Sequence, residues 1–179
     1  MKSLVVNMIG APGSGKSTLM SMVFAKLKER GIDAETVTEF TKELIWDDAF
    51  GKTADETYIY AEQHHRMFRL RDKVDVIVTD RPLLLTVFYN NKYGGGQFGE
   101  ELNALVMKDF MSYDNINFLL KRVNKYNPHG RVQTESESDE LYEDMKLFLK
   151  ENEIQYTEVE GDVKSADLIV NKVIERLNN

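Results

Sequence analysis

The sequence predicts a single α/β domain over residues 1–179, with a five-stranded parallel sheet, helices on both faces and a small lid. Five short segments rich in β-branched and apolar residues are spread along the chain, and segments with helical periodicity separate them. Strands that alternate with helices pair in parallel through right-handed crossovers. A chain of 179 residues, 42% of them hydrophobic, can bury a core without covalent cross-links.

The expected strands have unequal apolar character. They cover residues 3–9, 33–39, 75–80, 115–121 and 154–160. In the second of them, Glu35, Val37 and Glu39 alternate with small residues, which is a weak pattern for a strand buried on both faces. We therefore expect this strand at an edge of the sheet.

Helical segments lie between these strands. The first begins after residue 17 and is expected to end at Gly31 in a left-handed cap. Four more cover residues 53–73, 99–112, 138–151 and 164–177. Inward-facing side chains are expected at Leu19, Met22, Val23 and Leu27 in the first helix, and at Leu102, Leu105, Val106 and Phe110 in the helix at 99–112.

Two segments are typical of loops. Residues 90–98 contain three consecutive glycines, and residues 122–137 mix cations with Asn-Pro and a glycine. The second segment becomes acidic before the next helix. There Ser136 or Ser138 is expected to cap the helix, and the carboxylates favour its dipole.

Composition and charge exclude several classes of protein. The chain has no cysteine, so disulfides and thiolate metal sites are excluded, and its three histidines leave little for a zinc site. The formal net charge of −7 argues against a long nucleic acid as partner, because such proteins present a basic surface. No signal peptide and no run of roughly 20 apolar residues is recognised, so we expect a cytoplasmic protein that contacts no membrane.

The segment 10–17 reads GAPGSGKS and matches the phosphate-binding motif G-x-x-x-x-G-K-[ST] at every position. Glycines let phosphates approach the main chain, and successive amides at a helix N-terminus form a concave anion site. Lys16 would reach the outer phosphates, and Ser17 would place a hydroxyl on Mg²⁺. The motif predicts binding of ATP or GTP by Gly10, Pro12, Gly13, Ser14, Gly15, Lys16, Ser17 and Thr18.

A second motif, VIVTDRP at residues 76–82, is an apolar strand that ends in an acid. An acid in this place supplies a carboxylate toward the metal of a bound nucleotide, so Asp80 is expected beside Ser17 as a metal ligand. Arg81 is expected to face phosphates. The alternative for Arg81 is a salt bridge at a helix start, where Pro82 occupies a favoured first-turn position.

In this order of parts the chain resembles the nucleoside and nucleotide kinase branch of the P-loop proteins. Within that branch it is similar to deoxynucleoside kinases and to NadR-type ribosylnicotinamide kinases with their AAA-like relatives. The resemblance implies the P-loop NTP hydrolase fold, ATP and Mg²⁺ as ligands, and a small nucleoside-like phosphate acceptor. Gly161 and Asp162 after the last strand resemble the segment that contacts adenine in such kinases.

The resemblance also implies catalytic roles for three further residues. Glu39, at the end of the second strand, corresponds to the acid that faces the acceptor hydroxyl as general base; the alternative is an exposed edge acid. Arg122 and Arg131 bracket the expected lid at 122–137, where mobile arginines would stabilise the transferring phosphoryl group. The alternative for this segment is a solvated basic loop.

Residues of the helix at 53–73 are expected to bind the acceptor. Gln63 and Arg66 lie three positions apart and share a face. In deoxynucleoside kinases a glutamine on the corresponding helix pairs with the acceptor base, so the resemblance implies a nucleoside if Gln63 has that role. If Arg66 or Arg69 binds a phosphate instead, the acceptor is a monophosphate. An exposed polar helix face is the third interpretation.

The sequence therefore leaves three functions to compare. The first is a kinase for a nucleoside-like small molecule, with Lys16, Glu39, Asp80, Arg81, Arg122 and Arg131 as catalytic residues. The second is a polynucleotide or modified-DNA kinase with the same machinery. The third is a nucleotide-switched binding protein, although the expected N-K-x-D segment of GTPases is replaced by NKYN at 124–127. The acceptor, and the choice between monomer and homodimer, stay open.

Overall fold

The computed structural model describes residues 2–93, 98–129 and 133–179. Its strands are β1 (Leu4–Ile9), β2 (Ala34–Val37), β3 (Val76–Thr79), β4 (Asp114–Lys121) and β5 (Thr157–Glu160). They form one sheet in the order β2-β3-β1-β4-β5, in which every pair of neighbours is parallel. The five strands overlap the five predicted segments, and β2 lies at an edge as its weak apolar pattern predicts.

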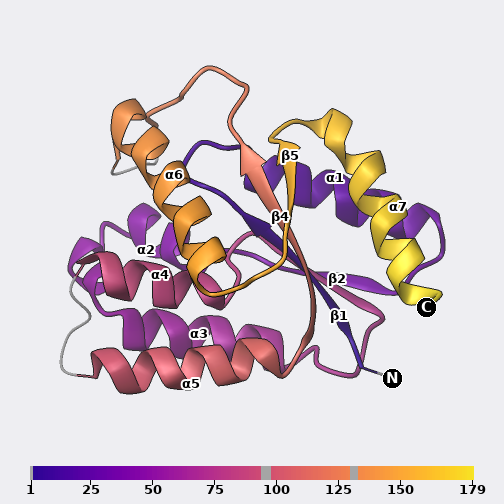
Figure 1. Cartoon of the computed structure of the whole chain (residues 1–179), viewed down its shortest axis with the longest axis horizontal. Helices are drawn as coiled ribbons and strands as arrows, with labels where there is room; N and C mark the ends of the chain where they lie inside the picture. The colour runs from indigo at the N-terminus through magenta and orange to yellow at the C-terminus, as the bar shows by residue number, and fades with distance from the viewer. Residues whose placement is uncertain (1, 94–97, 130–132) are drawn as a thin grey trace.

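Helices cover both faces of the sheet (Figure 1). One face carries α1 (Lys16–Glu29) and α7 (Ala166–Leu177), and the other carries α3 (Glu56–Phe68), α4 (Leu84–Tyr93), α5 (Gly99–Met111) and α6 (Glu135–Glu151). The short helix α2 (Phe40–Trp46) follows β2, and two 3₁₀ helices, η1 (Phe50–Ala54) and η2 (Val163–Ser165), lie in connections. The predicted fold class is confirmed.

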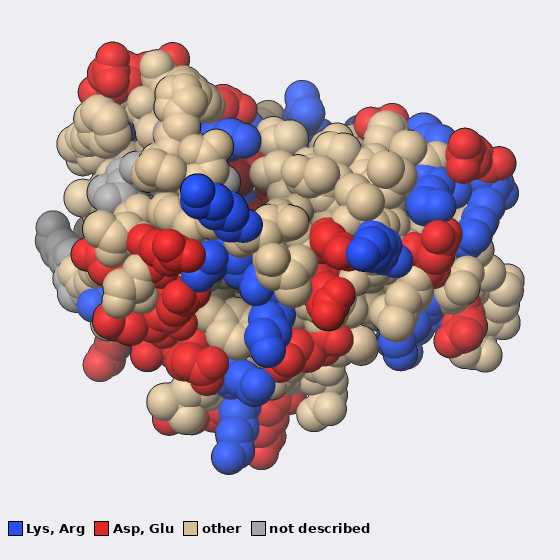
Figure 2. All heavy atoms as spheres, turned by 90° about the horizontal axis from the view of Figure 1, so that it is seen from above, with Lys and Arg blue, Asp and Glu red and all other residues tan. Residues whose placement is uncertain are grey.

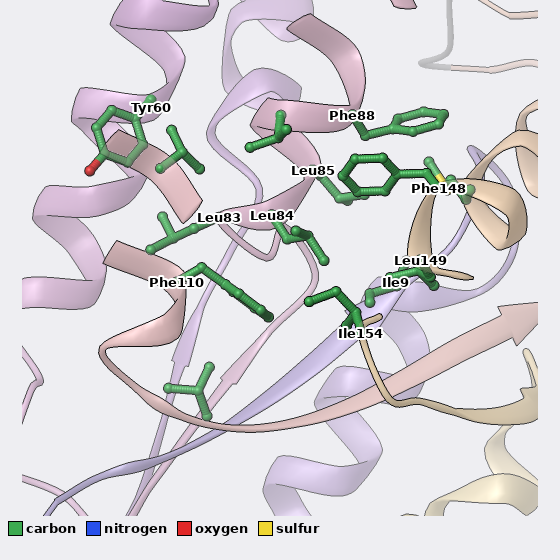
Figure 3. Close-up of a cluster of buried hydrophobic side chains, with 14 of the residues drawn as sticks. Ile9, Tyr60, Leu83, Leu84, Leu85, Phe88, Phe110, Phe148, Leu149 and Ile154 are labelled. Carbon is green, nitrogen blue, oxygen red and sulfur yellow. The ribbon is translucent and has the colours of Figure 1, made fainter. Parts of the chain in front are cut away.

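The two cores share the central strand. Leu4, Val6 and Met8 of β1 are buried against α1 and α7, whereas Val5 and Ile9 are buried in the core on the opposite face. Successive side chains of a strand point to opposite faces, so a strand buried on both sides is apolar throughout. Figure 3 shows the second core, in which side chains of α3, α4, α5 and α6 gather beside Ile9.

The sequence does not predict α2 and α4. Helix α2 has only seven residues, which is too short for a periodic pattern to be recognised. Helix α4 is buried on nearly all sides over Leu84–Phe88, so its sequence lacks the polar face of an amphipathic helix. The predicted helix at 53–73 is interrupted, because η1 ends at Ala54 and the Asp55 carboxylate caps α3 by accepting from the Tyr58 N–H.

The cap predicted for α1 is confirmed. Gly31 has a φ of +74°, its N–H donates to the Lys28 carbonyl at 3.0 Å, and the Ile32 N–H donates to Leu27 at 3.1 Å. These two bonds form a Schellman motif. The prediction that Leu105 of α5 faces inward is wrong. Its side chain is 52% exposed, because Leu102, Val106 and Phe110 already fill the inward face of that helix.

The start of α6 differs from the prediction. The helix begins at residue 135 rather than 138, and its cap is Thr134 rather than Ser136 or Ser138. Thr134 and Glu137 form a capping box, in which each side chain accepts from the main-chain N–H of the other residue. The residues just before the predicted start are therefore helical, and α6 overlaps the expected lid.

The surface carries charges of both signs. On the face in Figure 2, lysine and arginine side chains are interspersed with aspartate and glutamate side chains. Among the helices of the described ranges, none has the length and apolar character needed to cross a membrane.

Candidate active site

The carboxyl ends of β1, β2 and β3 meet at one edge of the sheet. After β1 the chain turns to α1 on one face, and after β3 it turns to α4 on the other face. Parallel sheets bind ligands where successive connections leave in opposite directions, because a crevice opens between them. The loop 10–15 follows β1, Glu39 lies just after β2, and Asp80 with Arg81 follows β3. The fold therefore brings the three predicted segments together.

A cavity of about 1040 Å³ lies at this edge. Part of its wall consists of predicted nucleotide-binding residues, namely Pro12, Gly13, Gly15, Lys16, Ser17 and Thr18. The rest of its wall includes Glu39, Arg81 and side chains from α2, the start of α3, α4 and the loop before α6. One cavity thus borders both the phosphate-binding motif and two of the residues expected to contact an acceptor, Glu39 and Arg81.

The loop between β1 and α1 has the conformation that its glycines permit. The Ser14 N–H donates to the Ala11 carbonyl at 3.2 Å, with Pro12 and Gly13 between them. Gly13 has a φ of +83°, so this is a type II turn, which requires a positive φ at its third residue. Gly15, with φ +91°, leads into α1, whose first amides have no partner within the helix. The loop and these amides suit an anion.

Lys16 lies across the loop. Its Nζ donates to the Gly10 carbonyl at 2.7 Å and to the Ala11 carbonyl at 3.1 Å. The ammonium group is therefore held beside the cavity that the loop borders, where it can act on phosphate oxygens as a point charge.

The turn after β5 supports the loop from behind. A Cβ atom on Gly161 would lie 1.7 Å from the Ser14 carbonyl oxygen, and one on Gly15 would lie 2.2 Å from the Gly161 oxygen. The two main-chain segments are thus in contact with no room for a side chain. The Gly161 N–H is fixed on the Lys121 carbonyl at 2.8 Å. Contact of Gly161 with adenine stays a prediction.

Ser17, Asp80 and Glu39 are linked by hydrogen bonds. The Ser17 hydroxyl donates to Asp80 Oδ2 at 2.5 Å, and Asp80 Oδ1 accepts from the Glu39 N–H at 2.8 Å. A hydroxyl and a carboxylate oxygen fit Mg²⁺, which takes one or two protein oxygens and completes its shell with water and phosphate. The described residues contain no group of three or more His, Cys, Asp or Glu side chains that could hold a metal. Ser17 and Asp80 offer a hydroxyl and a carboxylate oxygen of the kind that this ion takes, and their role as its ligands stays a prediction.

Arg81 is buried between two carboxylates. It is 3% exposed, with Nη1 3.5 Å from Glu39 and Nη2 3.2 Å from Glu56. Burial disfavours its charged form, yet the carboxylates of Glu56 and Glu39 hold the pKa of Arg81 above its ordinary value. The guanidinium also lies 4.8 Å from the centre of the Tyr89 ring. The two salt bridges hold the Glu39 and Glu56 carboxylates beside one guanidinium group at the cavity wall. Contact of Arg81 with a phosphate stays a prediction.

Burial acts differently on Glu56. It raises the pKa of the Glu56 carboxyl above its ordinary value, although the Arg81 charge opposes that change. Burial also raises the pKa of the Tyr89 phenol. Both groups line the cavity, and both hold their protons more firmly than the same groups in water.

Gln63 and Arg66 do not line the cavity. Gln63 is 1% exposed; its amide accepts from the Phe40 N–H at 3.2 Å and donates to the Thr38 carbonyl at 3.3 Å. Arg66 forms a two-pronged salt bridge with Glu43 at 2.7 and 2.9 Å. Gln63 thus holds the segment around Glu39, and its contact with an acceptor base stays a prediction.

Arg122, the first of the two predicted lid arginines, is not among the residues that line the cavity. Arg122 binds Glu135 at 2.7 Å and Asp139 at 2.5 Å, which ties the start of the lid segment to α6. Arg131 lies outside the described residues. His129 and Asn127 of the same segment do line the cavity, and the His129 ring contacts the Trp46 ring edge to face at 5.6 Å.

Several residues of the cavity wall are not predicted from the sequence as site residues. They include Thr41, Lys42, Glu56, Tyr89, Asn90 and His129, of which Asn90 is buried at 3% exposure. The sequence holds a weak signal for Glu56, since an acidic pair at 55–56 opens a helix, but capping explains such a pair equally well. Tyr89 and Asn90 belong to α4, a helix that the sequence does not reveal.

The loop, its lysine and the carboxylate after β3 define a P-loop nucleotide-binding protein of the α/β class. A family model described as an AAA domain matches residues 5–166. The chain belongs to this AAA domain family, in agreement with the predicted resemblance to P-loop kinases and their AAA-like relatives.

Solved structures of similar fold include two of NadR protein. In the complex with NR the TM-score is 0.72 at 19% identity, covering 96% of this chain and 51% of the NadR chain. In the complex with NAD and AMP-PNP the TM-score is 0.73 at 17% identity, covering 99% and 50%. This chain spans about half the length of those structures, and at such identities the likeness shows the fold. A search of curated protein sequences gave no match.

Proposed function

We propose that the protein is an ATP-dependent phosphotransferase that phosphorylates a hydroxyl group of a small nucleoside-like molecule. The observation that carries the proposal is the hydrogen-bonded chain from Ser17 through Asp80 to Glu39. It joins the end of the phosphate loop to an acid that borders the same cavity. A hydrolase would use such an acid on a water molecule instead of an acceptor hydroxyl, so the transfer screen below is designed to separate the two activities.

ATP would occupy the part of the cavity bordered by the loop. The amides of residues 13 and 15–18 and the Lys16 ammonium would bind its phosphates, and Ser17 with Asp80 would hold the Mg²⁺ ion. When bound, the ion would neutralise charge on the phosphate oxygens. The NadR complex with NAD and AMP-PNP, a protein of this fold, supports binding of a nucleotide here.

Glu39 would be the general base. Its carboxylate lines the cavity 3.5 Å from Arg81, and its main-chain N–H is fixed by Asp80. As the acceptor oxygen bonds to the γ-phosphorus, the bond from that phosphorus to the β–γ bridging oxygen breaks and ADP leaves. The hydroxyl proton passes to Glu39. Arg81 would stabilise negative charge on the transferring group, together with an arginine of a lid at 122–137, Arg122 or Arg131.

A hydroxyl acceptor is favoured over a monophosphate. Arg66, the cation expected to bind an acceptor phosphate, is paired with Glu43 and lies away from the cavity. Glu39 and Glu56 instead place two carboxylates on the acceptor side, and Arg81 is shared between them. Two acids beside one shared arginine repel an added phosphate but accept hydrogen bonds from hydroxyl groups.

The test is a transfer screen with γ-labelled ATP. Nucleosides, ribosylnicotinamide, nucleoside monophosphates and 5′-hydroxyl oligonucleotides would be offered in parallel, and label in the acceptor would be measured. We expect label in a nucleoside or ribosylnicotinamide. Label only in monophosphates or oligonucleotides would replace the proposed acceptor class, and release of free phosphate with every acceptor would favour a switch protein or hydrolase.

Binding of the acceptor can be followed separately. Trp46 is the single tryptophan of the chain, it is 58% exposed and it lines the cavity. An acceptor that enters beside it should change its fluorescence, and an ATP analogue bound at the loop alone should change it less. This readout distinguishes failure to bind an acceptor from failure to transfer phosphate.

A further inference from the structure

A hydroxyl group of α6 holds one peptide unit of the phosphate loop. Ser138 donates from Oγ to the Pro12 carbonyl at 2.6 Å, across 126 positions of sequence. Ser138 is 2% exposed, so water has little access to its hydroxyl. Neither the phosphate motif nor the proposed chemistry uses Ser138.

The bonded carbonyl belongs to the peptide unit that defines the turn. Residues 11–14 form a type II turn, and the Pro12–Gly13 peptide is its central unit. Type I and type II turns differ mainly by rotation of this unit, which reverses the direction of its carbonyl and its N–H. Gly13 permits either state because glycine adopts positive and negative φ with similar ease. The sequence of the loop alone therefore leaves the peptide free to rotate.

The direction of the carbonyl fixes the direction of the neighbouring amide. In a trans peptide the C=O and the following N–H point to opposite sides, and the chain has no cis peptide among its described residues. With the Pro12 carbonyl turned toward Ser138, the Gly13 N–H points away from α6. Gly13 lines the cavity. A rotated peptide would instead direct a carbonyl oxygen toward bound phosphates and repel them.

Ser138 is itself held in a fixed place. Its own N–H bonds to the Thr134 carbonyl at 3.0 Å, within the capped first turns of α6. On the outer side of the same turns, Arg122 binds Glu135 and Asp139. The helix start is thus anchored before and after Ser138, so its hydroxyl offers a preset donor rather than one that follows the loop.

We propose that Ser138 is a positioning residue for nucleotide binding: its hydroxyl selects the type II state of the 11–14 turn and so directs the Gly13 amide toward the phosphate chain. The proposal rests on the nucleotide site of the proposed function but not on the identity of the acceptor. It assigns part of the phosphate site to a helix that lies outside the sequence motif.

The experiment compares Ser138→Ala with Ser138→Thr and Ser136→Ala. Ser136 lies in the first turn of the same helix but is exposed, so it is a matched control. Alanine is the best helix former, and melting temperatures would verify that each variant is folded. The Kd values of AMP-PNP and AMP would be measured by calorimetry in the presence of Mg²⁺.

We expect Ser138→Ala to weaken AMP-PNP about 5- to 10-fold, which is the size of one lost hydrogen bond, and to leave AMP within about twofold. Ser138→Thr should restore AMP-PNP affinity because it keeps the hydroxyl, and Ser136→Ala should match the unaltered chain. In the ligand-free protein, the ¹⁵N–¹H resonance of Gly13 should move in Ser138→Ala and stay in Ser136→Ala.

Equal loss of AMP and AMP-PNP affinity in Ser138→Ala would overturn the proposal, since a general loosening of the fold lacks phosphate selectivity. Unchanged affinity for both would overturn it as well. If the unaltered chain binds AMP-PNP with the expected Ser138 effect but labels no acceptor, the phosphotransferase function fails and the role of Ser138 stands. If it binds no AMP-PNP, both fail.

Discussion

The cavity has two parts, which we call the phosphate part and the acceptor part after the ligands proposed to bind there. The phosphate part is made of main-chain groups from one continuous segment, whereas the acceptor part is made of side chains from several separate elements. The loop 10–15 and the start of α1 supply the first part within nine residues of sequence. Glu39, Glu56, Arg81 and Tyr89 supply the second, and they come from four places between β2 and α4.

This difference explains which part a sequence reveals. A site built from amides depends on residues that permit a local conformation, and glycines at fixed spacing record that requirement. A site built from side chains depends on which elements the fold brings together, and any residue type on a neighbouring helix can contribute. Variants in the two parts should therefore have different effects, which range from a loss of phosphate transfer to small changes in the free energy of unfolding.

The largest effect is expected in the phosphate part. Lys16→Ala should lower phosphate transfer at least about 100-fold with every acceptor, because a preorganised charge at the developing phosphate charge is removed. Lys26→Ala on the same helix removes only a surface salt bridge with Asp167 and is the control. Transfer rates with γ-labelled ATP decide the matter, and a Lys16→Ala rate within tenfold of the unaltered chain would contradict the role.

The next effect separates the two parts. Glu39→Gln should lower kcat about 10²- to 10⁴-fold, the usual contribution of a general base, while the Kd of AMP-PNP changes no more than a few fold. Glu35→Gln, on the strand that precedes Glu39 and 3.9 Å from Lys28, should keep full activity. Undiminished turnover in Glu39→Gln would remove Glu39 from the chemistry.

A smaller effect distinguishes support from contact on the acceptor side. Gln63→Ala should lower the free energy of unfolding by about 1–3 kcal/mol, because the buried Phe40 N–H loses its partner. Glu62→Ala, one position earlier on α3, is the control. Urea unfolding gives the stability, and acceptor titrations give KM. A raised KM at unchanged stability would instead assign Gln63 to the acceptor base.

The smallest effect concerns pH and Glu56. Its folded pKa is raised above the ordinary value of 4.5, so its protonated form stabilises the fold. That contribution is complete below pH 4.5 and is lost as the pH rises through the folded pKa. A tenfold change in the acid dissociation constant on folding corresponds to about 1.4 kcal/mol of stability.

The comparison with Glu56→Gln isolates this group, since glutamine stays neutral. The free energy of unfolding of the unaltered chain, relative to Glu56→Gln, should fall as the pH rises above 4.5, as measured by urea unfolding at several pH values. A relative stability that rises with pH would mean that the Arg81 salt bridge outweighs burial.

The sequence predicts most of the architecture because the strands are short, apolar and separated by periodic helices. It predicts the edge position of β2 because this strand has a weak apolar pattern, and only Ala34 and Val37 of its four residues are buried. Helix α4 escapes prediction because it is apolar on nearly all sides, and helical periodicity needs a polar side. Thr134 rather than a serine caps α6. The sequence does not distinguish among these residues, because serine and threonine are both favoured at the start of a helix.

The candidate site is predicted to a lesser extent. The motif residues 10–18, Glu39, Asp80 and Arg81 meet at one edge of the sheet, as the two motifs and the resemblance to P-loop kinases predict. Gln63 and Arg66 share a helix face in the sequence, but partners on α2 and in the segment between β2 and α2 use their polar groups. Glu56 cannot be distinguished from an ordinary first-turn acid by sequence, because its proximity to Arg81 arises only in the folded chain.

The contact between Gly161 and the loop has a consequence for shortened versions of the chain. A fragment that ends after α6 would contain the whole phosphate motif, both acids and Arg81, yet it would lack the main chain against which Ser14 and Gly15 rest. Its glycine-rich turn would face solvent on the side that β5 and η2 now cover. Expression trials and domain fusions should therefore extend through the last helix, since the final strand and its turn are a structural part of the nucleotide pocket in the same sense as the opening strand and its loop.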